Sequence, residues 1–301
     1  MLALQFKTYG GPEVLTVDEA PDVHAGPGQV RVNVRAASVN PIDWKMRAGY
    51  LAGGKPLEGT GYLGYDAAGV VDEVGDGVTD VVVGDEVFGL GSKTIAQFAV
   101  LETWAKKHPS VDWAVAAAAA VAAETSVRAL DLVGVSRGST LLIDGGAGGV
   151  GAVAVQIAIS RGAKVLATAS AGNLDYLREI GATGILYGDG LVERVRAIAP
   201  DGVDAVFDVV GKSSPGDLIS LVPKPSQVVT IARFDSADTG IQLTTGRSAT
   251  AKEALAEAAN LLAHSKLVIK IQTFPFDRAS EAHRISEHGH LRGKLVLIPE
   301  S

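Results

Sequence analysis

A glycine-rich stretch near the middle of the chain shows the strongest signal for chemistry. Residues 139–151 read Ser-Thr-Leu-Leu-Ile-Asp-Gly-Gly-Ala-Gly-Gly-Val-Gly, in which Gly146, Gly148 and Gly151 fit the pattern G-x-G-x-x-G. A short apolar run typical of a buried parallel strand precedes the glycines, and a helix-forming run follows them. In that context the pattern indicates dinucleotide binding. The alternative is an ordinary glycine-rich turn between a strand and a helix.

Each glycine of this pattern has a separate physical reason. Gly146 permits the tight turn, Gly148 lets the backbone approach a pyrophosphate, and Gly151 lets the helix pack closely against the strand. The helix begins without a capping side chain, so its first backbone N–H groups and its positive dipole end are available to phosphates. We therefore predict that Gly149 and Val150, together with these three glycines, bind the pyrophosphate.

The composition bounds the class of protein. The 301 residues suggest about two domains, and 47% apolar against 20% charged residues allows a large core. A net charge of −7 without a basic cluster argues against nucleic acid or an anionic membrane surface as a partner. The absence of cysteine excludes a disulfide, a thiolate zinc site and a cysteine nucleophile, and it agrees with the cytoplasmic location that we expect. The most membrane-like segment, residues 114–123, is too short to span a bilayer.

Two kinds of patterning divide the chain. Residues 1–100 alternate polar and apolar side chains between glycine-rich turns, which predicts an all-β region. After the glycine turn, strands and helices alternate, which predicts an α/β fold with a doubly wound parallel sheet. We predict strands at 164–169, 184–187, 204–209, 227–231, 268–274 and 294–298. We predict helices at 174–180, 191–198, 215–221, 250–262 and 279–288.

Polar and aromatic residues gather in one segment of the β region, residues 37–50, just after a strand. The segment places polar side chains among apolar ones, namely Asn40, Asp43, Lys45 and Tyr50 among Ile42, Trp44 and Met46. This mixture is typical of the wall of a binding site, with a solvated helical turn as the alternative.

Two further motifs have simpler interpretations. Residues 134–138 match the nucleophile elbow G-x-S-x-G but lie between a helix and a strand, which is the wrong order, so Ser136 is expected in a solvated loop. His283, Glu287, His288 and His290 invite a metal interpretation. A polar exposed helix is the preferred interpretation, and we predict no metal site.

Several motifs together resemble the zinc-free quinone oxidoreductase (zeta-crystallin-like) branch of the medium-chain dehydrogenase/reductase superfamily. They are the segments 38–43, 64–69, 84–89, 145–151, 167–170, 208–211 and 289–297. The resemblance covers essentially the whole chain. It implies a GroES-like β domain of residues 1–113 and 265–301, with a Rossmann NADP-binding domain of residues 114–264 inserted between them. It also implies a homodimer, formed through an edge strand of the nucleotide domain.

The positions at which zinc-dependent members of the superfamily have ligands differ here. Those members have a cysteine where Asn40 or a neighbour falls, and a Gly-His-Glu motif where this chain has Gly64, Tyr65 and Asp66. Zinc needs three or four nitrogen, sulfur or oxygen ligands. Alcohol dehydrogenation through a zinc alkoxide is therefore not expected.

The residues after the second strand of the α/β region predict NADPH rather than NADH. An NAD site usually places an acidic residue on the ribose about 20 residues beyond the glycines. Residues 168–173 contain no acid, and the side chains of Ser170 and Asn173 could donate hydrogen bonds to a 2′-phosphate. The resemblance implies further cofactor contacts, two at the phosphate-bearing end and two at the nicotinamide: Tyr187 and Arg292, and Asn40 and Thr125.

A nicotinamide without a metal points to hydride transfer onto an activated acceptor, a quinone or an α,β-unsaturated carbonyl. Hydride addition builds negative charge on the acceptor oxygen, which a cation or hydroxyl stabilises. Lys45 and Tyr50 are the candidate catalytic residues. In this branch, plant-type enone and alkenal reductases have lysine at the position of Lys45, which favours enones or enals. The alternative for Lys45 is an ordinary surface lysine.

Two other functions stay open at this point. One is a trans-acting enoyl reductase for carrier-bound acyl chains. The other is a catalytically weak NADPH-binding protein that acts as a sensor or a partner.

Overall fold

The computed structural model describes residues 1–289 and 291–299. Residue contacts divide the chain into two units. The β unit contains Met1–Val121, Leu255–Ala263 and Ile269–Ser301, and the α/β unit contains Ala122–Ala254 and His264–Val268. The contacts therefore assign residues 114–121 and 255–263 to the β unit, whereas the sequence-based boundaries place them in the nucleotide domain.

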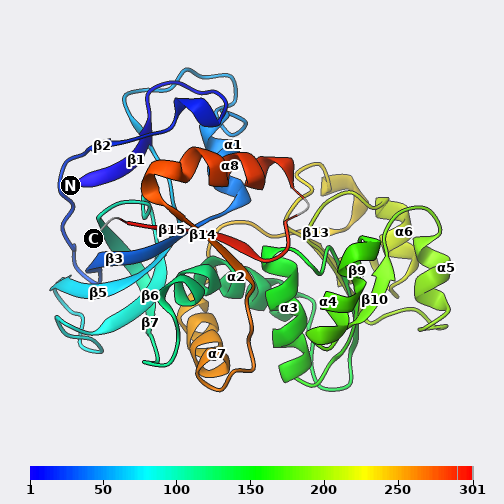
Figure 1. The fold of residues 1–301 in the computed structure, drawn as a ribbon. Helices are drawn as coiled ribbons and strands as arrows, with labels where there is room; N and C mark the ends of the chain where they lie inside the picture. Colours follow the sequence, from blue (N-terminus) through cyan, green and yellow to red (C-terminus); the bar gives the residue numbers. More distant parts are fainter. Residues whose placement is uncertain (290, 300–301) are drawn as a thin grey trace. The chain divides into compact units, whose positions relative to one another are not determined.

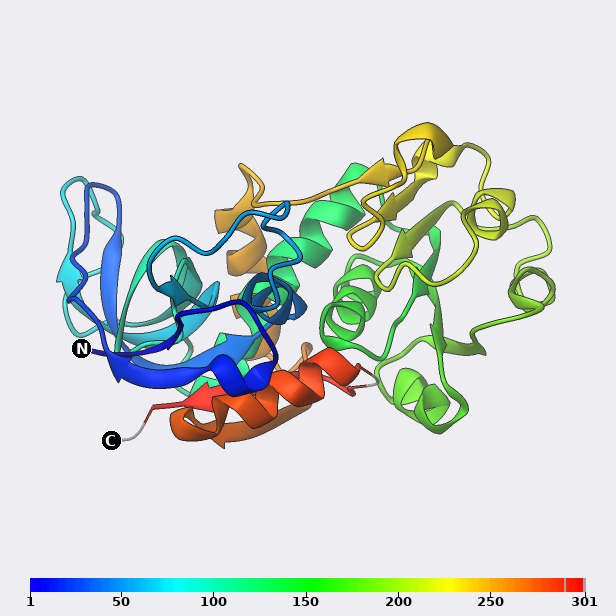
Figure 2. The ribbon, with the colours of Figure 1, turned by 90° about the horizontal axis from the view of Figure 1, so that it is seen from above.

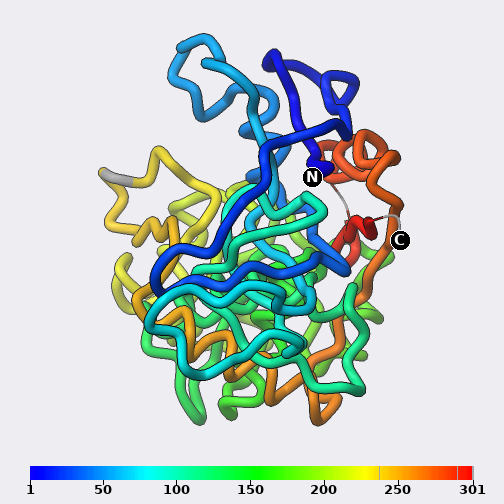
Figure 3. Tube along the Cα trace, turned by 90° about the vertical axis from the view of Figure 1, so that its left-hand side faces the viewer, coloured from blue at the N-terminus to red at the C-terminus, as the bar shows by residue number. Residues whose placement is uncertain are grey.

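The β unit is built on a six-stranded sheet with the order β14-β15-β3-β5-β6-β7, in which β3 also pairs with β7. Because of this extra pairing, β3, β5, β6 and β7 form a closed ring of paired strands. Val30, Val32 and Val34 of β3 are buried in the core of this unit. The C-terminal β15 lies antiparallel to β3. The first strands and the last helix and strands, blue and orange to red in Figures 1 and 3, therefore belong to the same unit.

The strands of the β unit are β1 (Leu2–Phe6), β2 (Thr16–Glu19), β3 (Val30–Val39), β4 (Gly61–Tyr62), β5 (Asp66–Val74), β6 (Glu86–Gly91), β7 (Phe98–Lys106), β14 (Ile271–Pro275) and β15 (Lys294–Ile298). Its helices are α1 (Pro41–Arg47) and α8 (Ala279–His288). Two helices cross from one unit to the other along the chain, α2 (Trp113–Leu132) and α7 (Ala251–Ala263). Among the described residues, α2 alone is long and apolar enough to cross a membrane, and 78% of its most apolar window is buried, as in a core helix.

The α/β unit is a six-stranded parallel sheet with the order β10-β9-β8-β11-β12-β13. This is the order of two mononucleotide-binding halves, and the direction of winding reverses between β8 and β11. Figure 2 shows helices on both sides of the sheet. The strands are β8 (Thr140–Asp144), β9 (Lys164–Ala169), β10 (Thr183–Leu186), β11 (Ala205–Asp208), β12 (Val228–Thr230) and β13 (Gln242–Leu243). The helices are α3 (Gly149–Ser160), α4 (Leu174–Glu179), α5 (Leu191–Arg196) and α6 (Pro215–Ser220).

The predicted fold class is confirmed: the chain has a β domain and a domain with a doubly wound parallel sheet. Strands β9 and β15 and helix α8 have the predicted bounds, and most other elements differ by one to three residues at their ends. Two differences are larger. Strand β13 was not predicted, and residues 41–47, within the segment predicted to form a site wall, form the helix α1, whose Asp43 and Arg47 are buried.

Candidate cofactor and active site

The glycine turn joins β8 to α3, whose N-cap residue is Gly148, so the helix begins without a capping side chain, as predicted. A Cβ atom on Gly146 would lie 2.6 Å from the Cβ of Ala167, and one on Gly151 would lie 2.1 Å from the carbonyl oxygen of Gly145. A Cβ on Gly148 would meet nothing nearer than that same oxygen, at 3.7 Å. The protein itself requires glycine at the first and third positions, whereas only an incoming ligand requires it at the second. The turn therefore fits the pyrophosphate of a dinucleotide.

Buried carboxyl groups support this turn from the ends of neighbouring strands. Asp144, the last residue of β8, accepts a hydrogen bond of 2.6 Å from the hydroxyl of Thr168, and that hydroxyl accepts one of 2.9 Å from the N–H of Gly145. Burial raises the pKa of Asp144. Asp208 is its register partner on β11, and it pairs with the guanidinium of Arg233 at 2.7 Å. One carboxylate oxygen of Asp144 is thus bonded to Thr168 at the end of the sheet, and this bond supports the glycine turn.

Three of the residues predicted to bind the 2′-phosphate end come together in the α/β unit. Ser170 follows β9 and is half-buried, and its hydroxyl accepts a hydrogen bond of 3.2 Å from the side-chain amide of Asn173. Tyr187 follows β10, is 50% exposed, and donates its backbone N–H to the carbonyl of Ala169. The strand ends therefore gather these groups on the carboxyl edge of the sheet, where parallel sheets bind ligands.

Two of the three remaining predicted contacts, Thr125 and Arg292, come from different parts of the chain. Thr125 is buried in α2, and Arg292 is an exposed residue of the β unit just before β15. Their contacts with a cofactor stay predictions.

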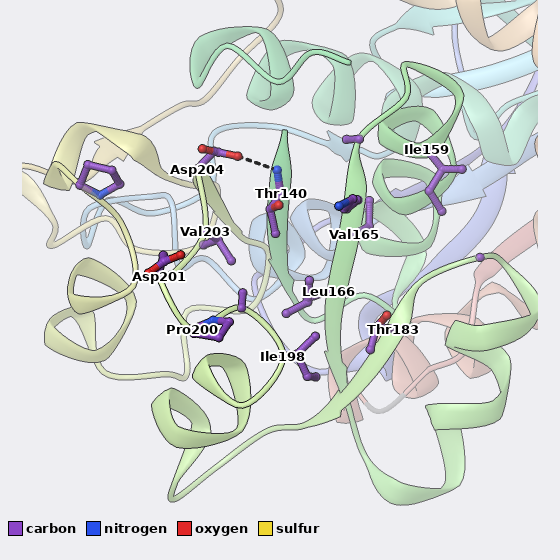
Figure 4. Close-up of a pocket in the computed structure, with 16 residues that line it drawn as sticks. Thr140, Ile159, Val165, Leu166, Thr183, Ile198, Pro200, Asp201, Val203 and Asp204 are labelled. Atoms are coloured by element: carbon purple, nitrogen blue, oxygen red, sulfur yellow. Dashed lines mark hydrogen bonds between the residues drawn. The ribbon is translucent and has the colours of Figure 1, made fainter. Parts of the chain in front are cut away.

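A hollow of about 690 Å³ lies at the opposite edge of the parallel sheet, as Figure 4 shows. Its walls include Thr140, Lys164 and Thr183, the first residues of three strands. Asp204 accepts a hydrogen bond of 2.7 Å there from the N–H of Thr140. The hollow therefore lies at the amino ends of the strands, away from the glycine turn, and is not the dinucleotide site.

The candidate catalytic residues lie on and after α1. Lys45 is half-buried, and its Nζ lies 5.8 Å from the centre of the Trp44 ring. Tyr50 is 69% exposed, and its ring meets that of Trp44 edge to face with 5.7 Å between centroids. The structure thus brings Lys45 and Tyr50 onto the same indole.

Asn40, predicted to contact the nicotinamide, lies at the start of α1 with its side chain buried. Its amide nitrogen donates to Asp66 at 2.9 Å and to Ser38 at 3.3 Å, and its amide oxygen accepts from the ammonium of Lys294. Lys294 was not among the site residues predicted from the sequence. A polar residue beginning an apolar strand usually lies at the surface, and only the pairing of β15 with β3 brings it here. The sequence did contain one indication of its importance, because Lys294 lies in the segment 289–297, one of the motifs that resemble the family.

This group of side chains does not fit zinc. A metal ion binds to lone pairs of ligand atoms. Here the ammonium of Lys294 already donates to the amide oxygen of Asn40, and its positive charge would repel a cation. Tyr65, in place of the histidine of zinc-dependent relatives, directs its hydroxyl to the sulfur of Met46. Within residues 1–289 and 291–299 no group of three or more histidine, aspartate or glutamate side chains could bind a metal ion.

The interpretation of α8 as a polar exposed helix is wrong at His283. This side chain is fully buried in the β unit, and neither ring nitrogen has a hydrogen-bond partner among the described residues. Glu287, one turn later, forms an ion pair of 2.6 Å with the buried Arg47 of α1. The third histidine of the motif, His290, lies outside the described residues. Ser136, by contrast, is exposed as predicted.

The stability of the protein is expected to depend on pH through His283. Burial, with a smaller contribution from Arg47, lowers the pKa of His283 to about 3. The unfolded chain therefore binds a proton at pH values between about 6.5 and 3 at which the folded chain does not, and stability falls as the pH falls through that window. In urea titrations at several pH values, wild type is expected to lose about 1.4 kcal/mol per pH unit more than His283→Leu in that window. Parallel curves for the two proteins would contradict this.

Comparisons with known proteins agree with this geometry. A family model described as an alcohol dehydrogenase GroES-like domain matches residues 26–129, and one described as a zinc-binding dehydrogenase matches residues 180–297. A 2-methylene-furan-3-one reductase of Solanum lycopersicum is 32% identical over 99% of this chain and 79% of its own length. A chloroplastic NADPH-dependent alkenal/one oxidoreductase of Arabidopsis thaliana is 31% identical over 99% of this chain and 80% of its own. The solved quinone oxidoreductase of Coxiella burnetii matches with a TM-score of 0.83 and 31% identity, over 99% of both chains.

The matches extend over both units. The two family models match a GroES-like segment and a dehydrogenase segment, and the relatives align with nearly the whole chain. The resemblance found in the sequence motifs is therefore confirmed. The chain belongs to the quinone oxidoreductase (zeta-crystallin-like) branch of the medium-chain dehydrogenase/reductase superfamily.

Proposed function

We propose that this protein is an NADPH-dependent oxidoreductase that reduces α,β-unsaturated carbonyls or quinones by metal-free hydride transfer. The observation that supports the cofactor most directly is the glycine turn, where the protein leaves empty the space that a Cβ on Gly148 would occupy. When bound, NADPH supplies the hydride. The names of two relatives, an alkenal/one oxidoreductase and a furanone reductase, favour the conjugated carbonyl over the quinone.

Each unit contributes its own groups to the proposed reaction. In the α/β unit, the backbone N–H groups at the start of α3 would bind the pyrophosphate, and Ser170, Asn173 and Tyr187 the phosphate-bearing ribose. In the β unit, the ammonium of Lys45 would stabilise the negative charge that develops on the acceptor oxygen. Tyr50, on the same indole, would donate its hydroxyl to the acceptor. A cytoplasmic location and a homodimer stay predictions from the sequence.

An acid at position 170 is expected to reverse the cofactor preference. Ser170→Asp would place a carboxylate where the 2′-phosphate binds, so we expect the Kd for NADPH to rise by about 30-fold or more and that for NADH to fall. The measurement is fluorescence titration with both cofactors. Ser136→Asp adds the same charge in an exposed loop before β8 and should change neither Kd. An unchanged preference in Ser170→Asp would remove Ser170 from the phosphate site.

Assays of NADPH oxidation with a small enone and with 1,4-benzoquinone test the activity itself. Oxidation of NADPH with either acceptor is the expected result. A protein whose melting temperature rises with NADPH while neither acceptor is reduced would be a cofactor-binding protein and not an enzyme of this class.

A further inference from the structure

Five polar side chains are buried together in the β unit: Ser38, Asn40, Asp43, Asp66 and Lys294, called here the buried cluster. They come from β3, the start of α1, α1 itself, β5 and β15, and each is at most 4% exposed. Burying charged groups costs free energy unless each finds a partner. In this cluster the partners are supplied by hydrogen bonds that also set the geometry at the start of α1.

The cluster fixes the side-chain amide of Asn40 on both sides. A lysine ammonium can only donate, so the atom that faces Lys294 must be the amide oxygen. The amide nitrogen then donates to Asp66 and to Ser38. The other carboxylate oxygen of Asp66 accepts the backbone N–H of Val121 at 3.0 Å. The orientation of the Asn40 amide therefore depends on the ammonium and carboxylate that flank it.

The cluster also fixes the start of α1. One carboxylate oxygen of Asp43 accepts the N–H of Asn40 at 2.7 Å, and the other accepts the N–H of Gly64 at 2.9 Å. Asp43 thus ties the first turn of the helix to the loop before β5. Lys45, the candidate catalytic residue, lies two residues further along this helix. The far end of α1 is held separately, by the ion pair of Arg47 with Glu287.

The charges within the cluster depend on one another. Burial raises the pKa of Asp66 and raises that of Asp43 to about 7, while Lys294 acts in the opposite direction on both. Burial lowers the pKa of Lys294, and the two carboxyl groups favour its charged form. Removing the ammonium would therefore leave two buried carboxyl groups without a cation and an amide oxygen without its donor.

We propose that Lys294 is a positioning residue of the reaction: its ammonium, hydrogen-bonded to the amide oxygen of Asn40, holds that amide and, through the buried cluster, the first turn of α1 in the arrangement that hydride transfer requires. This inference rests on the proposed function. Lys294 acts through Asn40 and α1 and touches neither substrate nor cofactor. Its contribution is electrostatic, so an uncharged group of the same size does not replace it.

Chemical rescue of Lys294→Ala tests this role. The substitution removes a propylammonium group and leaves a cavity of that shape. We expect kcat for an enone to fall by about 10-fold to 100-fold, because small displacements of reacting groups cost that much. The Kd for NADPH should stay within about twofold, because the groups proposed for the pyrophosphate and the phosphate-bearing ribose lie in the α/β unit and only the predicted nicotinamide contact of Asn40 is affected. Added propylammonium should restore a large part of kcat, and 1-propanol should not.

Lys107→Ala is the matched control. Lys107 is another buried lysine of the β unit, paired with Glu86 at 2.9 Å and bonded to the carbonyl of Val111. Its loss should lower the melting temperature comparably and leave kcat within about threefold. If Lys294→Ala does not fold, Lys294→Met keeps the apolar length of the side chain. A kcat lowered by about 10-fold or more in Lys294→Met would support the positioning role, and a kcat within about threefold of wild type would overturn it.

The outcomes separate the two proposals. Equal rescue by propanol and propylammonium, or a kcat within threefold of wild type in an active protein, would overturn the positioning role and leave the proposed function standing. If wild type itself reduces neither enone nor quinone, the proposed function fails and the positioning role fails with it.

Discussion

A Gly148→Ala variant is expected to fold normally and to lose most of its affinity for NADPH. The new Cβ would meet only the carbonyl oxygen of Gly145, at 3.7 Å, which is an ordinary contact, and the backbone there is extended. The Cβ would instead occupy the space through which a pyrophosphate approaches the first N–H groups of α3. Losing one charge-assisted hydrogen bond of this kind costs about 2 kcal/mol, so Kd should rise by about 30-fold. Fluorescence titration and thermal melts measure the two quantities.

Two other glycines of the α/β unit calibrate this result. Gly216→Ala makes the same change in α6, where the nearest atom is 3.6 Å away, and should leave Kd unchanged without lowering the melting temperature. Gly151→Ala forces a Cβ to 2.1 Å from a backbone oxygen and should destabilise the unit itself. If Gly148→Ala binds NADPH as wild type does, the glycine turn is not the pyrophosphate site.

A Lys45→Met variant is expected to bind NADPH normally and to reduce an enone slowly. The ammonium of Lys45 is the cation assigned to the charge that develops on the acceptor oxygen, and methionine keeps the length and apolar contacts of the chain over Trp44. Losing one such stabilising group costs about 10²-fold to 10³-fold in kcat. Steady-state kinetics with NADPH and the enone provide the measurement.

The exposed loop after α1 offers a matched control for that experiment. Lys55→Met removes the same charge at an exposed position and should leave kcat within about twofold. Tyr50→Phe should have a smaller effect than Lys45→Met, because Tyr50 is largely exposed to water. A Lys45→Met enzyme with the kcat/KM of wild type would make Lys45 an ordinary surface lysine.

The elements that local sequence determines were predicted well. The glycine turn requires a strand before it and a helix after it, and β8 and α3 have that arrangement. Helix α8 and strand β15 were predicted with their observed bounds, because long periodic segments with clear ends are the most reliable signal. Strand β13 has two residues, too few for any periodicity, and its place depends on pairing with β12.

The features that depend on contacts distant in sequence were missed. The polar residues around His283 and Glu287 led us to expect an exposed helix, yet α8 packs against α1 and the histidine is buried. Lys294 and Asp66 are separated by most of the chain, and local sequence does not show that both bond to the side chain of Asn40. The roles of Asn40 and Lys45 could be proposed from position in a motif, whereas the buried cluster that holds Asn40 required the pairing of β15 with β3.

The central claim is that the protein delivers hydride from NADPH to a conjugated carbonyl. The most direct measurement uses NADPH deuterated at C4 of the nicotinamide, on either face, with an enone as acceptor and analysis of the product by mass spectrometry and NMR. The claim predicts a saturated ketone with deuterium on the former β-carbon, from one of the two labelled cofactors. An allylic alcohol with deuterium on the carbonyl carbon, or a product without deuterium from either cofactor, would contradict it.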